Sequence, residues 1–286
     1  MMRKMTRRSF LKALPLGLAT YIFACSGLYV YGRKIERYRP VIEHVEIPIK
    51  DLPDDLVGFR IVAMGDLHID PFWDFDLIEK VCTLANQANP DLTLLLGDYV
   101  SWDINALDTL KDQLAGLRAK FGVYACLGNH EVWLDAILAR EKLEGMGITV
   151  LVNAGTAIQV GDATLYAAGL DSWWNAYGSP DLDAALRDVH PNDVVVVMMH
   201  EPDYADISAQ DGRVDLQLSG HSHGGQVVLP VWGTIYSALY SRKYPIGLYH
   251  VGDIWQYTTR GIGVTDNVRF RVNCPPEVTE IELVYA

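Results

Sequence analysis

Short apolar runs alternate with longer amphipathic segments from Phe59 onward, and this alternation constrains the fold more than any other feature of the 286 residues. Apolar residues at every third or fourth position predict a helix, whereas a short, bounded apolar run predicts a buried strand. The expected strands are 60–64, 92–96 and 123–127, and the expected helices are 75–89, 104–120 and 132–144. This order predicts βαβ units with parallel strands.

Helices become scarce in the second half of the chain, where apolar strands continue. These are expected at 148–152, 164–168, 194–199 and 216–218, followed by a β-rich tail through Tyr249, Tyr257 and Ile281. Half of the residues are hydrophobic and no linker divides the middle, which favours one large domain over residues 59–286. We expect an α/β fold in which two packed mixed β-sheets are flanked by helices.

Polar residues follow the expected strands where each strand ends. Gly65-Asp66-Leu67-His68, Gly97-Asp98, Gly128-Asn129-His130-Glu131, His200 and Gly220-His221-Ser222-His223 occupy these junctions. Loops at the carboxyl ends of neighbouring strands meet at one edge of a sheet, so these side chains are expected to converge. Carboxylates mixed with neutral imidazoles suit Mn, Fe or Zn better than Ca, which prefers oxygen ligands. The pattern therefore favours a transition-metal site.

The ordered pattern D-x-H, G-D, G-N-H-[DE], H and G-H-x-H between Asp66 and His223 resembles the calcineurin-like metallophosphoesterase superfamily. The G-H-x-H-G-G-Q run ending at Gln226, with the segments 260–263 and 276–277, is similar to bacterial exported or membrane-associated phosphoesterases of the YkuE/YaeI type. The resemblance implies an α/β/β/α metallophosphoesterase sandwich over 59–286 that binds two divalent metal ions, Mn, Zn or Fe.

The resemblance also implies a division of labour among the motif residues. Four residues would bind one metal, namely Asp66, His68, Asp98 and His223. Four would bind the other, namely Asp98, Asn129, His200 and His221. Asp98 would bridge the two ions, a metal-bridging hydroxide would attack phosphorus, and Asn129 would stabilise charge in the transition state. His130 would face the substrate phosphate and protonate the leaving group.

The implied reaction is phosphoester hydrolysis, as a phosphodiesterase or a pyrophosphatase acting at the cell envelope. One alternative is a UDP-2,3-diacylglucosamine pyrophosphatase-like enzyme of lipid A synthesis, which would act on the cytoplasmic side. A non-catalytic metal-binding scaffold and a pure membrane-interaction module represent two different classes of function. Retention of all the expected ligands and His130 disfavours the scaffold, and the metal-ligand pattern would be superfluous in a membrane module.

The chain departs from the serine/threonine protein phosphatases of this superfamily in one motif. Ser101 and Trp102 stand where those enzymes have an Asp that supports the catalytic histidine and the Arg that follows it. A protein phosphatase is therefore disfavoured. A carboxylate supporting His130 would have to come from elsewhere, with Asp103 and Glu131 as the candidates.

Aromatic residues follow several of these motifs, and they suggest an apolar rim beside the metals. The residues are Phe72, Trp73, Tyr99, Trp102, Trp133, Trp173 and Trp174. Such a rim could accept an acyl chain, a nucleobase or a membrane interface, or the rings could simply fill space between loops and core. Arg242, Lys243 and Arg260 could neutralise distal phosphate oxygens, but solvated surface charge is the favoured interpretation of these residues.

The N-terminus carries a targeting pattern. Thr6-Arg7-Arg8-Ser9-Phe10-Leu11-Lys12 resembles a twin-arginine signal, and an uncharged run from Ala13 to Gly32 follows. Residues 1–32 are therefore interpreted as a signal for the twin-arginine translocase or as a retained membrane anchor. Residues 33–58 are interpreted as a basic juxtamembrane segment and a lead-in strand. Export would place the protein at the inner membrane or outside the cytoplasm, although the cytoplasmic face stays open.

Charge and cysteine content narrow the partners further. The net charge is −12, and it becomes −17 without the five basic residues before position 13. An acidic body repels a nucleic-acid backbone, so no nucleic-acid partner is expected. The substrate is instead expected to be a phosphodiester or pyrophosphate, including a lipid-linked one. The four cysteines show no C-x-x-C spacing, and Cys82 and Cys126 are expected to be buried thiols.

Overall fold

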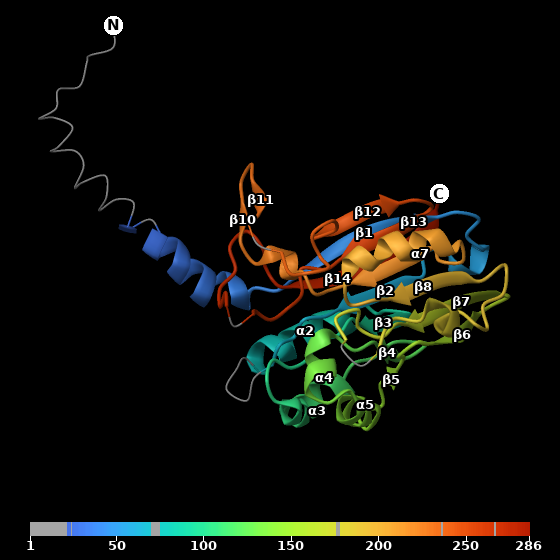
Figure 1. Cartoon of the computed structure of the whole chain (residues 1–286), viewed down its shortest axis with the longest axis horizontal. Helices are drawn as coiled ribbons and strands as arrows, with labels where there is room; N and C mark the ends of the chain where they lie inside the picture. The colour runs from blue at the N-terminus through green and yellow to red at the C-terminus, as the bar shows by residue number, and fades with distance from the viewer. Residues whose placement is uncertain (1–21, 24, 70–74, 176–177, 236, 266) are drawn as a thin grey trace, which may run out of the picture.

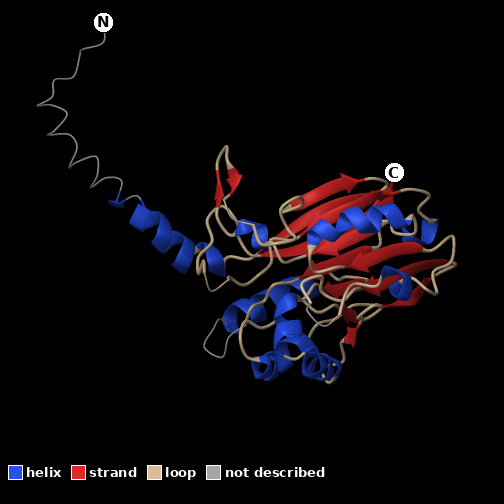
Figure 2. Cartoon of the chain, viewed as in Figure 1, coloured by secondary structure: helices blue, strands red, loops and turns tan. Residues whose placement is uncertain are grey.

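The computed structural model describes residues 22–23, 25–69, 75–175, 178–235, 237–265 and 267–286. Two six-stranded sheets dominate these residues (Figures 1 and 2). The first has the order β1 (Val41–Ile49), β14 (Glu277–Tyr285), β2 (Arg60–Met64), β3 (Leu92–Leu95), β4 (Val123–Ala125) and β5 (Thr149–Val150). The second has the order β12 (Gly247–Val251), β13 (Ile254–Thr258), β9 (Leu216–Ser219), β8 (Val194–Met198), β7 (Ala163–Gly169) and β6 (Ala154–Val160).

Both sheets are mixed. The run β2 to β5 is parallel, β14 is antiparallel to β2, and β1 pairs with β14 in parallel. The run β7, β8, β9, β13 is also parallel, with antiparallel β6 and β12 at its edges. Residues before Phe59 thus contribute a nine-residue strand to the first sheet.

Helices cover the outer face of each sheet. The helices are α2 (Phe75–Gln87), η3 (Ile104–Leu110), α3 (Lys111–Ala115), α4 (Asn129–Leu134), α5 (Ala136–Glu144), α6 (Leu182–Ala185) and α7 (Ala205–Asp211), with short 3-10 turns η1 (Glu36–Tyr38), η2 (Asp54–Leu56), η4 (Pro202–Tyr204) and η5 (His223–Gly225). The core on the outer face of the first sheet includes side chains of α2, η3, α3 and α5, and that of the second includes α6 and α7. A third core lies between the sheets. The expected two packed mixed sheets flanked by helices are confirmed.

Two helical segments differ from the sequence expectation. The segment expected at 104–120 forms the 3-10 helix η3 and then α3, and α3 ends at Ala115 before Gly116. The segment expected at 132–144 begins earlier, at Asn129, and breaks at Asp135, where φ is −168°. The Asp135 carboxylate accepts the Leu138 N–H and so starts α5 as a new helix.

The remaining described segments lie outside the two sheets. A helix over residues 25–34 extends from the body, and a small hairpin is formed by β10 (Val228–Leu229) and β11 (Gly233–Thr234) (Figure 1). Within the described residues, no helix combines the length and apolar character needed to cross a bilayer. The twin-arginine-like residues 6–12 and the first part of the uncharged run lie outside the described residues. Cys82 and Cys126 are buried free thiols, as expected.

Candidate metal centre

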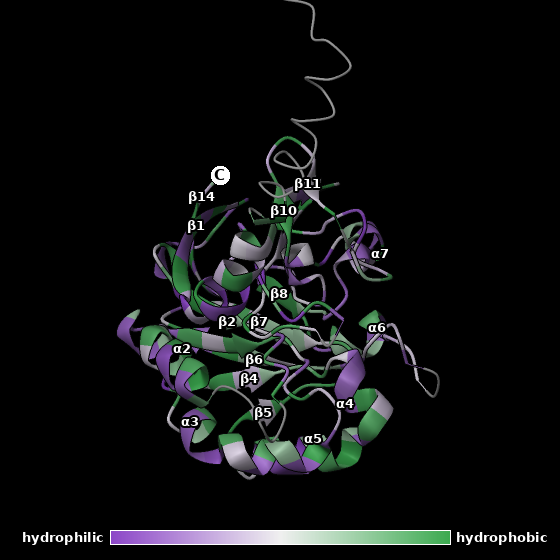
Figure 3. Cartoon of the chain, turned by 90° about the vertical axis from the view of Figure 1, so that its left-hand side faces the viewer, coloured by the Kyte–Doolittle hydropathy of each residue, from purple (hydrophilic) through white to green (hydrophobic). Residues whose placement is uncertain are grey.

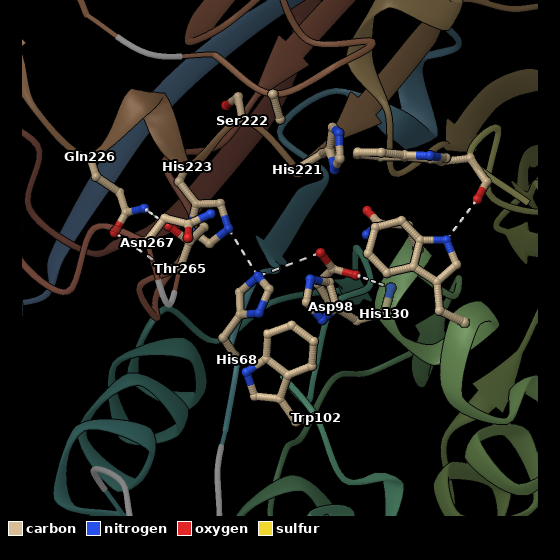
Figure 4. A pocket seen from close by; sticks show the side chains of 14 residues that line it. His68, Asp98, Trp102, His130, His221, Ser222, His223, Gln226, Thr265 and Asn267 are labelled. Carbon is tan, nitrogen blue, oxygen red and sulfur yellow. Dashed lines mark hydrogen bonds and ion pairs between the residues drawn. The ribbon is translucent and has the colours of Figure 1, made fainter.

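The expected ligands come together where five strands of the two sheets end. Asp66 follows β2, Asp98 follows β3, Asn129 follows β4, and His200 and His221 follow β8 and β9. Parallel packing aligns the carboxyl ends of these strands, so loops more than a hundred residues apart in sequence meet at one edge. Figure 4 shows the side chains that line the resulting cavity of about 230 Å³.

Asp98 lies at the centre of the cluster. One of its carboxylate oxygens, Oδ2, is 3.1 Å from His200 Nε2 and 3.5 Å from His68 Nε2. His223 Nε2 is 2.9 Å from His68 Nε2 and 3.4 Å from Asp66 Oδ1. Two groups of metal-ligating atoms result, Asp66 with His68 and His223, and Asp98 with His200 and His221. His68 also groups with Asp98 and His130, so Asp98 stands between the two groups.

Several buried polar atoms of this cluster are acceptors that face other acceptors. The His200 Nδ1–H donates to the Leu96 carbonyl at 2.6 Å, so Nε2 is the ring atom that faces the Asp98 carboxylate, at 3.1 Å. The Asn129 Oδ1 is buried and has no hydrogen-bond partner. Buried lone pairs without donors are costly unless a cation occupies the space between them. The residues present therefore fit divalent cations, as the resemblance implies.

Burial also sets the protonation of these side chains. It lowers the pKa of His68 to about 3 and lowers the pKa of His221 and of His223 as well. These imidazoles are therefore neutral at neutral pH, the form that binds metals. Burial raises the pKa of Asp66 to about 7, a cost that a bound cation would remove.

The backbone of the cluster is strained. Asp66, His68, Asp98, His221 and His223 all have φ between 46° and 67°, the left-handed region that non-glycine residues rarely adopt. Each such residue costs on the order of 1–2 kcal/mol. Strain of this kind persists where surrounding contacts over-determine the geometry, as they do at functional sites.

Buried carboxylates hold the ligand loops in place. Glu131 accepts backbone N–H groups from Asp98, Tyr99, Val100 and Gly128 at 2.8–3.2 Å and so joins the loops after β3 and β4. A second buried residue, Glu201, accepts the N–H groups of Trp173 and Trp174 at 3.1 and 3.2 Å. Glu131, next to His130, therefore holds the loops after β3 and β4 together. Glu201, next to His200, holds the loop that carries Trp173 and Trp174.

The His130 ring is oriented by a backbone carbonyl. Its Nδ1 lies 2.7 Å from the Ser101 carbonyl, so Nδ1–H donates there and Nε2 is directed to the cavity. Neither candidate carboxylate hydrogen-bonds this ring among the described residues, so that expectation is wrong. Asp103 instead caps η3 by accepting the Asn105 N–H. The sequence could not predict which carbonyl bonds to His130, because every residue has a backbone carbonyl.

The aromatic expectation is confirmed for three rings and wrong for one. Trp102, Trp133 and Trp174 line the cavity, whereas Tyr99 is fully buried with its hydroxyl donating to the Cys126 carbonyl at 2.6 Å. Trp173 stacks on Tyr240 at 4.7 Å. Phe72 and Trp73 lie outside the described residues.

The basic candidates do not line the cavity. Lys243 pairs with Asp206, and Arg260 pairs with Glu43 at 2.6 Å and with Glu277. No Lys or Arg appears among the described residues of the lining, whereas Gln226, Thr265 and Asn267 do. Sequence reasoning missed Thr265 and Asn267, which follow no strand-end motif. The surface-charge interpretation therefore holds for Lys243, whereas it is wrong for Arg260, whose side chain is largely buried and paired with Glu43 and Glu277.

Comparison with known proteins agrees with this arrangement. A family model described as calcineurin-like phosphoesterase matches residues 59–225. The chain is 32% identical to the metallophosphoesterase YkuE of Bacillus subtilis over 99% of each protein. It is 34% identical to the phosphodiesterase YaeI of Escherichia coli over 98% of this chain and 99% of YaeI. It is also 28% identical to a Danio rerio transmembrane protein with a metallophosphoesterase domain, over 91% of this chain and 61% of that protein.

The motif order, the two packed sheets and these full-length relatives agree, and the resemblance seen in the sequence is confirmed. The chain therefore belongs to the calcineurin-like metallophosphoesterase family and is a metal-dependent phosphoester hydrolase.

Proposed function

We propose that this protein is a phosphodiesterase that works with two divalent cations, Mn, Zn or Fe, at the cell envelope. One cation is assigned to Asp66, His68, Asp98 and His223, and the other to Asp98, Asn129, His200 and His221. The observation that carries this proposal is the convergence of buried imidazole nitrogens and carboxylate oxygens into one group on each side of Asp98. A shared carboxylate reduces the repulsion between two nearby cations.

The ligand atoms follow from the hydrogen bonds of each ring. The His221 Nε2–H donates to the Leu239 carbonyl at 2.7 Å, so Nδ1 is the atom left for a cation. His200 has the opposite arrangement, with Nδ1–H bonded to Leu96 and Nε2 left over. Such bonds set the tautomer and fix the plane of the ring. The chain thus orients both rings before any cation arrives.

When bound, the two cations supply Lewis-acid chemistry, which activates water and neutralises the charge of phosphoryl oxygens. The protein residues orient the substrate and protonate the leaving oxygen. The bond between Nδ1 and the Ser101 carbonyl directs His130 Nε2 to the cavity, so the protonated ring can donate Nε2–H to the leaving oxygen. Asn129 can donate its amide N–H to a phosphoryl oxygen through the same opening.

The cavity wall favours a substrate with an apolar or aromatic leaving group. His130 contacts Trp133, with ring centres 5.3 Å apart, and Trp133 contacts Trp174 at 4.8 Å. Trp102 also contacts His130, with ring centres 6.1 Å apart. This wall stands beside the residue assigned to the leaving oxygen. A lipid-linked or aromatic diester would bury apolar surface there, as a hydrophilic leaving group would not.

The envelope assignment rests on the N-terminal pattern and on exposed apolar side chains. Residues 6–12 resemble a twin-arginine signal, and the described helix over 25–34 exposes Leu28, Tyr29 and Val30. The Danio rerio relative is itself named a transmembrane protein. A membrane-attached hydrolase, delivered by the twin-arginine translocase, accounts for both features.

Hydrolysis of bis-p-nitrophenyl phosphate tests the reaction. Metal-stripped protein should be inactive and should regain diester cleavage with Mn, Zn or Fe. The Asp98→Ala variant should bind less metal and lose activity, whereas His130→Ala should keep its metal and lose turnover by about 100-fold. Exposed Glu141→Gln serves as the control. Restored activity in Asp98→Ala, or a metal-free His130→Ala protein, would contradict the assigned roles.

A substrate comparison tests the aromatic wall. Trp102→Ala and Trp133→Ala should weaken cleavage of a lipid-linked diester more than cleavage of dimethyl phosphate, which has no large apolar group to bury. Exposed Ile137→Ala on α5 is the matched control. Equal losses for both substrates would argue against recognition by the wall.

A further inference from the structure

The β10–β11 hairpin ends in a tip that is apolar and fully exposed. Val231 is 100% exposed, Trp232 is 81% exposed, and Ile235 beyond β11 is 62% exposed. Val231 also has φ of 76°, a conformation that β-branched residues avoid. Large exposed apolar side chains that gather on a protruding hairpin indicate a surface that binds a protein or a membrane.

The hairpin is joined to the N-terminal helix through one short segment. The Arg271 N–H donates to the Gly32 carbonyl at 3.2 Å, and the next residue, Val272, accepts the Val228 N–H at 3.0 Å. The Tyr29 ring packs against Phe270, with centres 5.2 Å apart. Figure 1 shows the helix and hairpin at the same end of the molecule, and Figure 3 looks onto that end. Their relative positions are therefore set by hydrogen bonds.

The chemistry of this end matches a lipid surface. The helix over 25–34 continues an uncharged run that begins at Ala13, and Phe23 just before it is 82% exposed. Arg33 and Lys34 follow this run as the last two residues of the helix, on a protein whose remaining charge is strongly negative. Tryptophan is favoured at the membrane interface, and basic residues are attracted to anionic headgroups. A protein partner would not require Trp232 to be combined with the basic residues Arg33 and Lys34.

We infer that the tip formed by Val231 and Trp232 inserts into the surface of an anionic bilayer, as a second membrane contact beside the N-terminal helix. The inference concerns the hairpin, and its consequence for substrate rests on the proposed function. The hairpin base is tied to the metal cluster, because Thr234 Oγ1 donates to the Gly224 carbonyl at 3.2 Å, next to His223. Insertion of the tip therefore orients the cavity relative to the bilayer.

The cavity opens beside the hairpin. Gln226 and Ala238 flank it in the chain, and both line the cavity together with Thr265. The Gln226 side chain donates to Thr265 Oγ1 at 2.7 Å, which holds this side of the opening. A tip seated among lipid headgroups would keep the opening near the surface, where a diester linked to a lipid presents its phosphate.

Fluorescence quenching by brominated lipids tests the insertion in the full chain. Vesicles of phosphatidylglycerol and phosphatidylethanolamine with brominated acyl chains should quench the wild-type protein. Trp232→Phe should lower the quenched amplitude by about twofold or more, since this ring sits deepest in the interface. Trp255→Phe, which replaces a half-buried indole on β13 outside the cavity lining, is the control and should leave the amplitude nearly unchanged. An unchanged amplitude in Trp232→Phe overturns the inference.

A second variant separates membrane contact from catalysis. Val231→Ser combined with Trp232→Ser removes side chains that lie outside the packed cores, so folding should be retained. Vesicle affinity should fall by about tenfold, with hydrolysis of soluble bis-p-nitrophenyl phosphate unchanged. Loss of a dimer in light scattering, with unchanged vesicle affinity, would show that the tip binds a second copy and would overturn the inference. Absence of soluble diester hydrolysis in the wild type would instead count against the proposed function.

Discussion

Substitution of Gly128 by Ala should displace the shared carboxylate. A Cβ at this position would lie 2.2 Å from Asp98 Oδ1 and 2.8 Å from Asp98 Cγ. The backbone of Gly128 is extended, with φ of −95°, so alanine is compatible with this conformation. The cost of the substitution therefore comes from the overlap with Asp98. Relief of the overlap requires a shift of about 1 Å in a packed, buried loop, at a cost of about 1–3 kcal/mol.

Two effects oppose each other in this variant, and their magnitudes decide the outcome. Glycine to alanine stabilises by about 0.4–1 kcal/mol through the unfolded chain, less than the cost of the overlap. The free energy of unfolding should therefore fall. A displacement of about 1 Å in a catalytic group lowers the rate by about 100-fold. We expect weaker metal binding together with this loss of turnover.

The assay combines elemental analysis of bound metal, urea unfolding and hydrolysis of bis-p-nitrophenyl phosphate. Gly27→Ala is the control, because a Cβ there meets nothing within 4 Å. It should match the wild type in metal content and kcat, and its free energy of unfolding should not fall. Wild-type metal content and kcat in Gly128→Ala would refute the reasoning, since they would show that Asp98 need not hold its position.

Three further substitutions and treatments follow from the structure. Tyr99→Phe should lower the free energy of unfolding by about 1–2 kcal/mol, because the Cys126 carbonyl loses its donor, while metal content in the same preparation stays normal. Burial raises the pKa of Asp215 to about 6, because the ionised carboxylate is disfavoured in the folded protein. The contribution of the protonated carboxyl to the free energy of unfolding is therefore complete below the unfolded pKa near 3.8 and is lost as pH rises through 6. Asp215→Asn should thus be about 2 kcal/mol more stable than wild type at pH 8 and equal at pH 3.5 in urea unfolding; equal stability at both would contradict this. Chelation should lower Tm by about 5 °C relative to protein with cation at about 100 times Kd, and Asp98→Asn should abolish that difference.

Local sequence patterns predicted much of the fold because each reflects a local physical requirement. The apolar runs 60–64 and 92–96 become β2 and β3 almost residue for residue, since a fully buried strand needs a continuous apolar run. The segment 132–144 was less predictable. Its break at Asp135 depends on the hydrogen bond that the Asp135 carboxylate accepts from the Leu138 N–H. The spacing of the apolar residues does not reveal this bond.

The site divides in the same way. The ordered donors from Asp66 to His223 are chemically distinctive, and their place after strands predicts that they meet. Their tautomers depend on the carbonyls of Ser101, Leu96 and Leu239, which any residue could supply. Tyr99 follows a motif in sequence, yet its ring turns into the core.

The amino-acid sequence by itself determined the ligand types, their order along the chain and the periodicity that builds two sheets. Only the tertiary structure decided that Asp98 lies between two groups of ligands, that Trp174 stands beside Trp133, and that the β10–β11 hairpin is bonded to the same segment as the N-terminal helix. Side-chain chemistry and periodicity are local properties. Contacts between distant segments depend on how the two sheets pack, and the whole chain sets that packing together.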